Sequence, residues 1–200
     1  MTTPRDLLIV SMDAPSHRPV EQGDLSLALA GAEVIDLIGA GALTLEAELI
    51  LPSGRWTLPD RLLDEAASSL LRQSPPESVE DWLWRRGRGL SSAYLAALEA
   101  EGHLARQRGR WIPVPTGRTA LVDSAARRHA ADRWASGDPV LTALAAAVGI
   151  HHGPAGDLPG VDDAVVTVLA AVGDAVVELD AVRQRRAIEE AAFDNVWRGQ

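Results

Sequence analysis

Residues 21–41 read EQGDLSLALAGAEVIDLIGAG, and this stretch decides the fold. Its apolar residues recur at intervals typical of a helix with one buried side, and they are Leu25, Ala28, Leu29, Val34, Leu37 and Ile38. Gly39 and Gly41 come directly after them, and glycine commonly ends a helix. The stretch therefore predicts a helix over residues 21–38.

The neighbouring segments predict shorter elements. Thr3-Pro4 looks like a helix start, with proline at the first helical position, and the helix should run to about Met12. Residues 43–51 alternate as a strand does, and Pro52-Ser53-Gly54 should turn the chain toward a short partner strand near Trp56. A further helix is expected over residues 59–72.

The second half of the chain predicts more helices and one hairpin. Ser78 should cap a helix because Asp81 stands at its third position. The expected elements are helices over 79–86, 90–101 and 116–134, a hairpin over 103–114, a core helix over 139–150, and helices over 161–172 and 174–197. The fold class is thus mainly α, a compact helical domain with a β-hairpin and a short strand pair, and residues 1–200 should form a single domain.

Composition argues against several kinds of chemistry. The chain has no cysteine, and all 19 of its basic residues are arginine, so it lacks thiolate nucleophiles, Cys-based metal sites and any P-loop or Schiff-base lysine. His151-His152 is the strongest metal cue, but no carboxylate follows at a ligand-like spacing. No serine stands in a nucleophile-elbow context. We expect no catalytic residue, no metal, no cofactor and no enzyme activity.

The chain also lacks the signs of membrane insertion or export. None of its apolar runs approaches the roughly 18 residues that span a bilayer. The apolar stretch Leu7–Met12 is short and lies between Asp6 and Asp13, unlike a secretory signal. We expect a soluble, cytoplasmic protein.

Charge is distributed unevenly along the chain. Residues 1–84 hold 5 Arg and 14 acids, residues 85–133 hold 10 Arg and 4 acids, and residues 134–200 hold 4 Arg and 10 acids. A basic middle between acidic flanks suggests a positive face that attracts phosphates, lipid headgroups or nucleic acid. Alternatively, these arginines pair with the acidic flanks inside the molecule. Both interpretations remain open at the level of sequence.

Two of the six tryptophans lie beside arginine clusters, as aromatic residues do where proteins contact a membrane interface or a nucleic acid. The candidate headgroup-binding residues are Arg85, Arg86 and Arg88. The candidate interfacial residues are Trp84, Arg106, Arg108, Arg110 and Trp111. Packing in the core is the competing role for both tryptophans.

Residues 78–114, read as helix, turn, helix and hairpin, also have the outline of a winged helix, which makes a DNA-binding transcription regulator the alternative function. The second helix presents Ser91, Ser92 and Tyr94 and no Arg, Asn or Gln to read base edges. Nucleic acid is therefore the less favoured partner.

Several stretches, in this order, resemble the Golgi phosphoprotein 3 family, including its members from actinobacteria. They are DLLIVSMD near the start, LALAGAEVIDLIGAGALTLE (27–46), LLDEA (62–66), SPPESVEDWL (74–83), LEAEGHL (98–104) and SGDPVLTALAAAVGI (136–150). The resemblance covers nearly the whole chain and implies a compact, mostly helical fold with a hairpin.

The resemblance also implies a function. Eukaryotic members of the family bind phosphatidylinositol 4-phosphate and act as adaptors, with a headgroup pocket made of a Trp, an Arg in the second helix and two further basic residues. Those positions correspond to Glu21, Ala30, Arg88 and Ser91, so only Arg88 keeps the family's residue type, with Arg85 and Arg86 nearby as substitutes.

Together these observations predict a non-enzymatic binding or adaptor protein. It should bind phosphoinositide or another anionic lipid headgroup, or a protein partner, from the cytoplasmic face of a membrane, where it would be peripheral. The sequence leaves its oligomeric state open.

Overall fold

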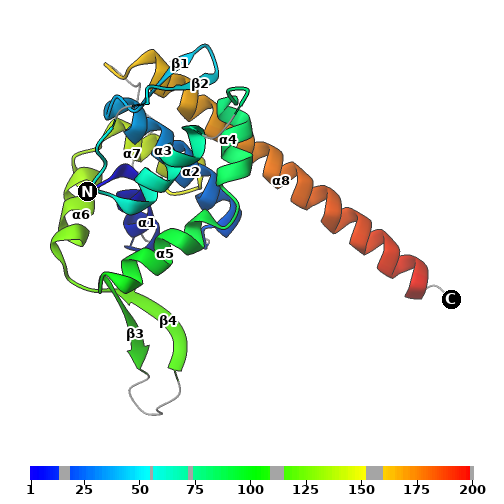
Figure 1. Ribbon diagram of the computed structural model, residues 1–200. Coiled ribbons are helices and arrows are strands. Elements are labelled where there is room, and N and C mark those ends of the chain that lie inside the picture. Colours follow the sequence, from blue (N-terminus) through cyan, green and yellow to red (C-terminus); the bar gives the residue numbers. More distant parts are fainter. Residues whose placement is uncertain (14–18, 55, 72–73, 109–114, 152–159, 199–200) are drawn as a thin grey trace.

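The computed structural model describes residues 1–13, 19–54, 56–71, 74–108, 115–151 and 160–198, and all structural statements concern these residues. They form eight helices and two antiparallel strand pairs, which confirms the mainly α fold class (Figure 1). The helices are α1 (Thr3–Asp13), α2 (Gln22–Gly39), α3 (Arg61–Leu71), α4 (Val79–Arg86), α5 (Leu90–Ala100), α6 (Ala125–Ala135), α7 (Pro139–Ala147) and α8 (Asp163–Arg198). The strands are β1 (Leu43–Glu46), β2 (Leu49–Pro52), β3 (Leu104–Arg108) and β4 (Pro115–Leu121).

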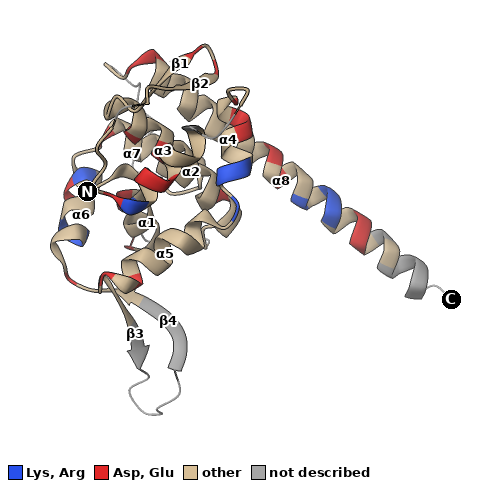
Figure 2. Ribbon diagram, viewed as in Figure 1, with Lys and Arg blue, Asp and Glu red and all other residues tan. Residues whose placement is uncertain are grey.

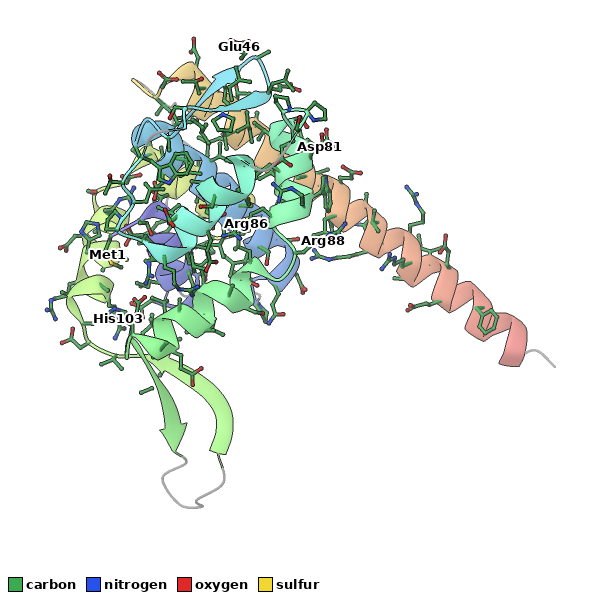
Figure 3. The ribbon with its side chains drawn as sticks, in the orientation of Figure 1. Met1, Glu46, Asp81, Arg86, Arg88 and His103 are labelled. Atoms are coloured by element: carbon green, nitrogen blue, oxygen red, sulfur yellow. The ribbon has the colours of Figure 1, made fainter. Side chains whose placement is uncertain are left out.

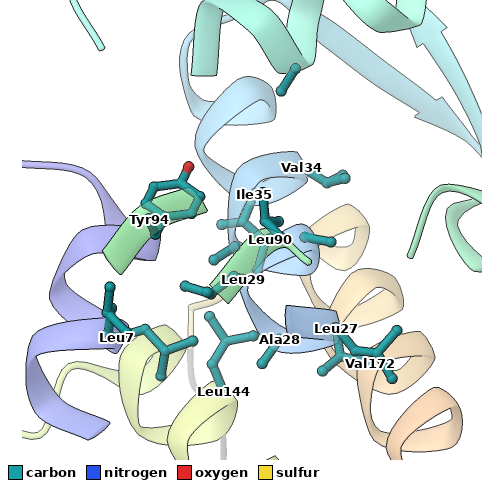
Figure 4. Close-up of a cluster of buried hydrophobic side chains, with 14 of the residues drawn as sticks. Leu7, Leu27, Ala28, Leu29, Val34, Ile35, Leu90, Tyr94, Leu144 and Val172 are labelled. Atoms are coloured by element: carbon teal, nitrogen blue, oxygen red, sulfur yellow. The ribbon is translucent and has the colours of Figure 1, made fainter. Parts of the chain in front are cut away.

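Helix α2 lies at the centre of the body and is buried nearly all round (Figure 4). It contacts α1, α3, α4, α5, α7 and α8. Ala28, Leu29 and Ala30 are all fully buried, although consecutive residues point in different directions around a helix. Sequence periodicity predicted one apolar side, whereas the structure covers every side.

Close packing of α8 on α2 depends on one glycine. A Cβ atom at Gly31 would lie 2.3 Å from the Cγ2 atom of Val172, so a larger residue would push the two helices apart. Val168, Val172 and Ala175 form the buried side of α8 at this contact.

Helix α8 is continuous, so the predicted break between residues 172 and 174 was wrong. Gly173 lies inside the helix instead of ending it. A glycine in a helix interior costs about 1 kcal/mol relative to alanine. The buried side chains on both sides of Gly173 offset that cost by packing on α2.

The first strand pair is shorter than predicted. Leu43 pairs with Pro52 and Glu46 with Leu49, so the turn lies at Ala47 and Glu48, not at residues 52–54 near Trp56. Ala47 adopts a left-handed φ of 54°. The sequence pointed to the wrong turn because glycine and proline usually mark turns, and here an alanine occupies that conformation.

The second strand pair is longer than predicted. Leu104 pairs with Leu121 and Arg106 with Thr119, so residues 115–121 belong to β4 and not to a helix starting at residue 116. Helix α6 begins at Ala125, where the Oγ atom of Ser124 accepts a hydrogen bond from the backbone N–H of Arg127 at 3.2 Å. Pairing with β3 overrode the local helical pattern before that cap.

Other local signals were confirmed. The Oγ atom of Ser78 accepts a hydrogen bond from the backbone N–H of Asp81 at 3.0 Å and caps α4, as the capping-box pattern predicted. Helix α7 lies in the core through Leu141, Leu144 and Ala145.

A buried ion pair ties α2 to α4. Glu33, fully buried in α2, accepts two hydrogen bonds from Arg86, both at 2.8 Å, and a third from the hydroxyl of Tyr94 at 3.0 Å. Arg86 also donates to the carbonyl oxygen of Leu62 at 3.1 Å. Burial raises the pKa of the Glu33 carboxyl, and the hydrogen bonds from Arg86 and Tyr94 oppose that rise.

We expect Arg86→Met to lower the free energy of unfolding by about 3–5 kcal/mol at neutral pH, because it leaves a buried carboxylate without its partner. A carboxyl whose folded-state pKa is raised is better tolerated in its protonated form, so the loss should shrink as the pH falls toward 5. Urea unfolding followed by tryptophan fluorescence measures both effects.

The double variant Glu33→Gln with Arg86→Met is the control, because it leaves no buried charge without a partner. Its stability should depend much less on pH than that of Arg86→Met. A loss in Arg86→Met that is the same at pH 5 and pH 8 would contradict this account.

Candidate functional site

The basic middle segment comprises residues 85–133. Most of its arginines whose side chains are described form ion pairs within the molecule. Figure 2 shows acidic and basic residues interspersed over the body. Four arginines of the middle segment form ion pairs with acidic residues of the acidic segment 1–84. The pairs are Arg85–Glu77, Arg86–Glu33, Arg127–Asp13 and Arg133–Asp6. For these four residues the structure supports intramolecular pairing and not a free positive face.

The three candidate headgroup residues therefore have different environments. Arg86 points inward to Glu33, and Arg85 binds the buried Glu77 and lies 5.0 Å from the ring centre of Trp82. Arg88 is exposed. In Figure 3, Arg86 lies toward the middle of the body, whereas Arg88 lies at its edge close to α8.

Arg88 and Trp84 line a pocket of about 310 Å³ between the N-termini of α2 and α5, which we call the α2–α5 pocket. Its lining residues are Gln22, Gly23, Ser26, Leu27, Trp84, Gly87, Arg88, Gly89, Ser91, Ser92 and Leu179. Trp84 is half-buried and packs against the core.

Two glycines position Arg88 at the mouth of this pocket. Gly87 ends α4, and a Cβ atom there would lie 2.5 Å from the carbonyl oxygen of Leu83, so only glycine fits. Gly89 has a left-handed φ of 72° and begins α5. Between them the chain passes from α4 to α5 within three residues, and Arg88 is exposed.

A buried serine pair fixes the start of α5 to α2. The Oγ atom of Ser26 donates to the Oγ atom of Ser91 at 2.9 Å, and the same Ser26 oxygen accepts from the backbone N–H of Ser91 at 3.1 Å. Both residues lie at the pocket. The serine pair holds the floor of the pocket in one geometry.

Neither helix that begins at the pocket is capped by the side chain of its own N-cap residue, but the Ser26 hydroxyl of α2 accepts from the N–H of Ser91 at the start of α5. These N-cap residues are Glu21 for α2 and Gly89 for α5. By contrast, α4, α6 and α7 are each capped by a serine or an aspartate. Helix N-termini carry partial positive charge, so two of them beside an exposed arginine favour an anion.

Helix α8 forms the remaining wall. Arg183 binds Asp24 of α2 at 2.6 Å, and a Cβ atom at Gly23 would lie 2.6 Å from the Arg183 guanidinium and 2.9 Å from Leu179. Glycine at position 23 therefore lets α8 close over the start of α2.

The remaining candidate residues are placed only in part. Arg106 and Arg108 belong to β3, but their side chains lie outside the described part of the structure, as do Arg110 and Trp111 entirely. Whether they join Arg88 on one surface stays a prediction.

Of the positions aligned with the family's headgroup pocket, Arg88 and Ser91 line the α2–α5 pocket. Ala30 does not, because it is fully buried and its carbonyl oxygen accepts a hydrogen bond from the Trp82 indole at 3.0 Å. Sequence reasoning missed Ser26, Gln22 and Ser92. Glycines on both sides of an exposed arginine were the only local signal for this site.

The arrangement is suited to binding and not to acid–base chemistry. The pocket contains one arginine, hydroxyl groups, an aromatic side chain and backbone N–H groups. Within the described ranges, no three His, Asp or Glu side chains are grouped so as to hold a metal ion. The pocket thus offers donor groups of the kinds that anion-binding sites use.

Comparison with known families identifies the family of this chain. Residues 4–191 match the Golgi phosphoprotein 3 (GPP34) family, so the chain belongs to this family. The family is not known as an enzyme family. No curated protein matches the chain.

We expect Gly87→Ala to destabilise the protein by about 1–3 kcal/mol, because the new Cβ atom would press against the Leu83 carbonyl oxygen and force the α4–α5 turn to shift. Thermal unfolding measures the change. Gly39→Ala is the matched control, since a Cβ atom there meets nothing within 4 Å, and it should leave stability within about 0.5 kcal/mol. Equal effects of the two variants would contradict the steric argument.

Proposed function

We propose that this protein is a non-enzymatic, peripheral membrane-binding protein that takes an anionic phosphorylated lipid headgroup into the α2–α5 pocket from the cytoplasmic side. The observation that carries the proposal is the exposed Arg88 beside the N-termini of two helices in one pocket. Arginine and backbone N–H groups are the donors that phosphate recognition commonly uses.

Family membership supports the same proposal. Eukaryotic relatives use the corresponding position of Arg88 in their phosphoinositide pocket, as the resemblance implies. This chain differs because hydroxyl groups and helix N-termini replace the other basic residues. We therefore infer weaker recognition that relies on Arg88, with Trp84 at the pocket providing interfacial contact.

A peripheral mode of binding fits the helices. None of those in the described ranges is both long enough and apolar enough to cross a bilayer. Binding would then rest on the pocket and on charge, and it would be sensitive to salt because charges in water are screened over about 8 Å at physiological ionic strength.

DNA binding is less well supported. The exposed residues of α5 are Ser92, Ala96, Glu99 and Ala100, which offer no arginine, asparagine or glutamine to a base edge. A nonspecific DNA shift assay run beside the lipid assay would separate the two functions.

We expect the protein to float with phosphatidylcholine vesicles that contain phosphatidylinositol 4-phosphate, and not with phosphatidylcholine alone. A hydrogen bond to a charged group contributes about 1.5–3 kcal/mol. Arg88→Glu should therefore weaken binding at least about tenfold, and binding should fall steeply as salt is added. Liposome flotation measures all three outcomes.

Arg128→Glu is the matched control because it makes the same charge change at an exposed residue of α6, away from the pocket. Vesicles with phosphatidylserine at equal surface charge separate headgroup recognition from general attraction. Equal flotation of Arg88→Glu and wild type would overturn the proposal. Affinity for DNA without affinity for either vesicle would favour the alternative function.

A further inference from the structure

Helix α8 carries an exposed stripe along the side that faces away from the core. The stripe, which we call the α8 stripe, consists of Val166, Ala170, Gly173, Val177, Ala181, Gln184, Ile188 and Ala191. These residues follow each other at intervals of three or four, so they share one side of the helix. All of these residues are exposed except Gly173, which is half-buried, and Val177 and Ile188 are 70% and 69% exposed.

This stripe is distinct from the surface by which α8 packs on the body. The packed surface is formed by Val168, Val172 and Ala175. At 100° per residue, Val172 and Val177 lie about 140° apart around the helix. The α8 stripe therefore has no role in holding α8 to α2.

Gly173 lies in the middle of the stripe without any reason in its own chain to be glycine. A Cβ atom there would meet nothing within 4 Å. Glycine in a helix interior costs about 1 kcal/mol relative to alanine. At Gly31, elsewhere in this chain, a tight contact between two helices explains why the residue is glycine. A close approach from outside the chain would account for Gly173 in the same way.

The second half of α8 projects from the body as an arm (Figure 1). Every residue from Gln184 to Ala191 is exposed. Isolated helices shorter than about 12–15 residues are marginal in water, so an arm of this length gains stability when a partner covers it.

The acidic and basic residues along α8 are placed so that they can pair with those of a second copy of the same helix. Asp174 and Glu178 flank the first half of the stripe, and Arg185 flanks the second half on the same side of the helix. Figure 2 shows the acidic and basic bands alternating along the projecting helix. An antiparallel copy of α8 would bring each Arg185 to the Glu178 of the other chain.

We propose that α8 is a homodimerisation helix, which pairs antiparallel with α8 of a second copy of this chain through the α8 stripe. In this register Gly173 faces Ile188 of the partner subunit, Val177 faces Gln184 of the partner subunit and Ala170 faces Ala191 of the partner subunit. The twofold axis of this register passes between Asp180 and Ala181, so Ala181 lies close to Ala181 of the partner subunit. The largest side chain of the stripe thus sits opposite the residue with no side chain.

A groove on the body continues this interface. It has a volume of about 430 Å³ and lies between α8 and the start of α4, with Val79 and Ala171 among its apolar residues. Glu48, Glu80, Asp174 and Glu178 line its rim. The arm of the partner subunit would run along this groove, and Arg185 of the partner subunit would meet its acidic rim.

The association itself is tested by the mass in solution. Sedimentation or light scattering at micromolar concentration should give twice the 21.3 kDa of one chain. Gly173→Leu should give the monomer mass with unchanged circular dichroism, because a Cβ atom there meets nothing in its own chain, whereas a leucine side chain would block the close approach of the partner. A wild-type monomer at all concentrations, or a Gly173→Leu dimer, would overturn the proposal.

The antiparallel register is tested by disulfide cross-linking, which is clean because the natural chain has no cysteine. Ala181→Cys should oxidise to a covalent dimer. Ile188→Cys alone should not, because its two copies would lie about 22 Å apart along the axis, whereas Gly173→Cys mixed with Ile188→Cys should. Cross-linking of Ile188→Cys alone would show a parallel pair and refute the register.

The charge pairing is tested by exchange. Arg185→Glu or Glu178→Arg should each raise the dimer dissociation constant at least about fivefold, and the double variant should restore it. Arg186→Glu is the matched control, since this neighbouring arginine lies on another side of the helix. Equal weakening by Arg186→Glu, or failure of the double variant to recover, would count against the pairing. None of these variants touches Arg88, so the lipid assay reports separately on the proposed function.

Discussion

Glu33 is a carboxylate in the middle of a helix that has no free side. Because water cannot reach it, its charge has to be matched from within the protein. Arg86 provides that match with two hydrogen bonds, and Tyr94 adds a third. This requirement fixes α4 and α5 against α2, since both partners come from those two helices.

The position of the pocket follows from the same requirement. Gly87 and Gly89 carry the chain from Arg86 at the end of α4 to the start of α5, because Gly87 allows a close contact with the Leu83 carbonyl oxygen and Gly89 adopts a left-handed φ. Arg88 lies between them and is exposed beside the starts of α2 and α5. Arg86 thus supports the fold, and Arg88, two residues later, belongs to the candidate site.

Much of the fold was predictable because its signals are local. Apolar periodicity gave the helices, and Ser78 gave the start of α4, since a capping side chain and the N–H that donates to it lie within one turn. The errors occurred where pairing between distant residues decides. β4 replaced the start of a predicted helix because β3 was available to pair with it, and α8 ran through Gly173 because α2 packs against both sides of that position.

The amino-acid sequence alone shows that this chain is helical, lacks cysteine and lysine chemistry, and carries Arg88 between two glycines. It also carries the ordered motifs of the family. The tertiary structure, by contrast, sets which arginines remain exposed, because the acids that pair with them can lie more than 50 residues away, as Glu33 does from Arg86. It likewise decided that Ser26 and Ser91 meet, and that one side of α8 stays uncovered, since burial is a property of neighbours in space and not along the chain.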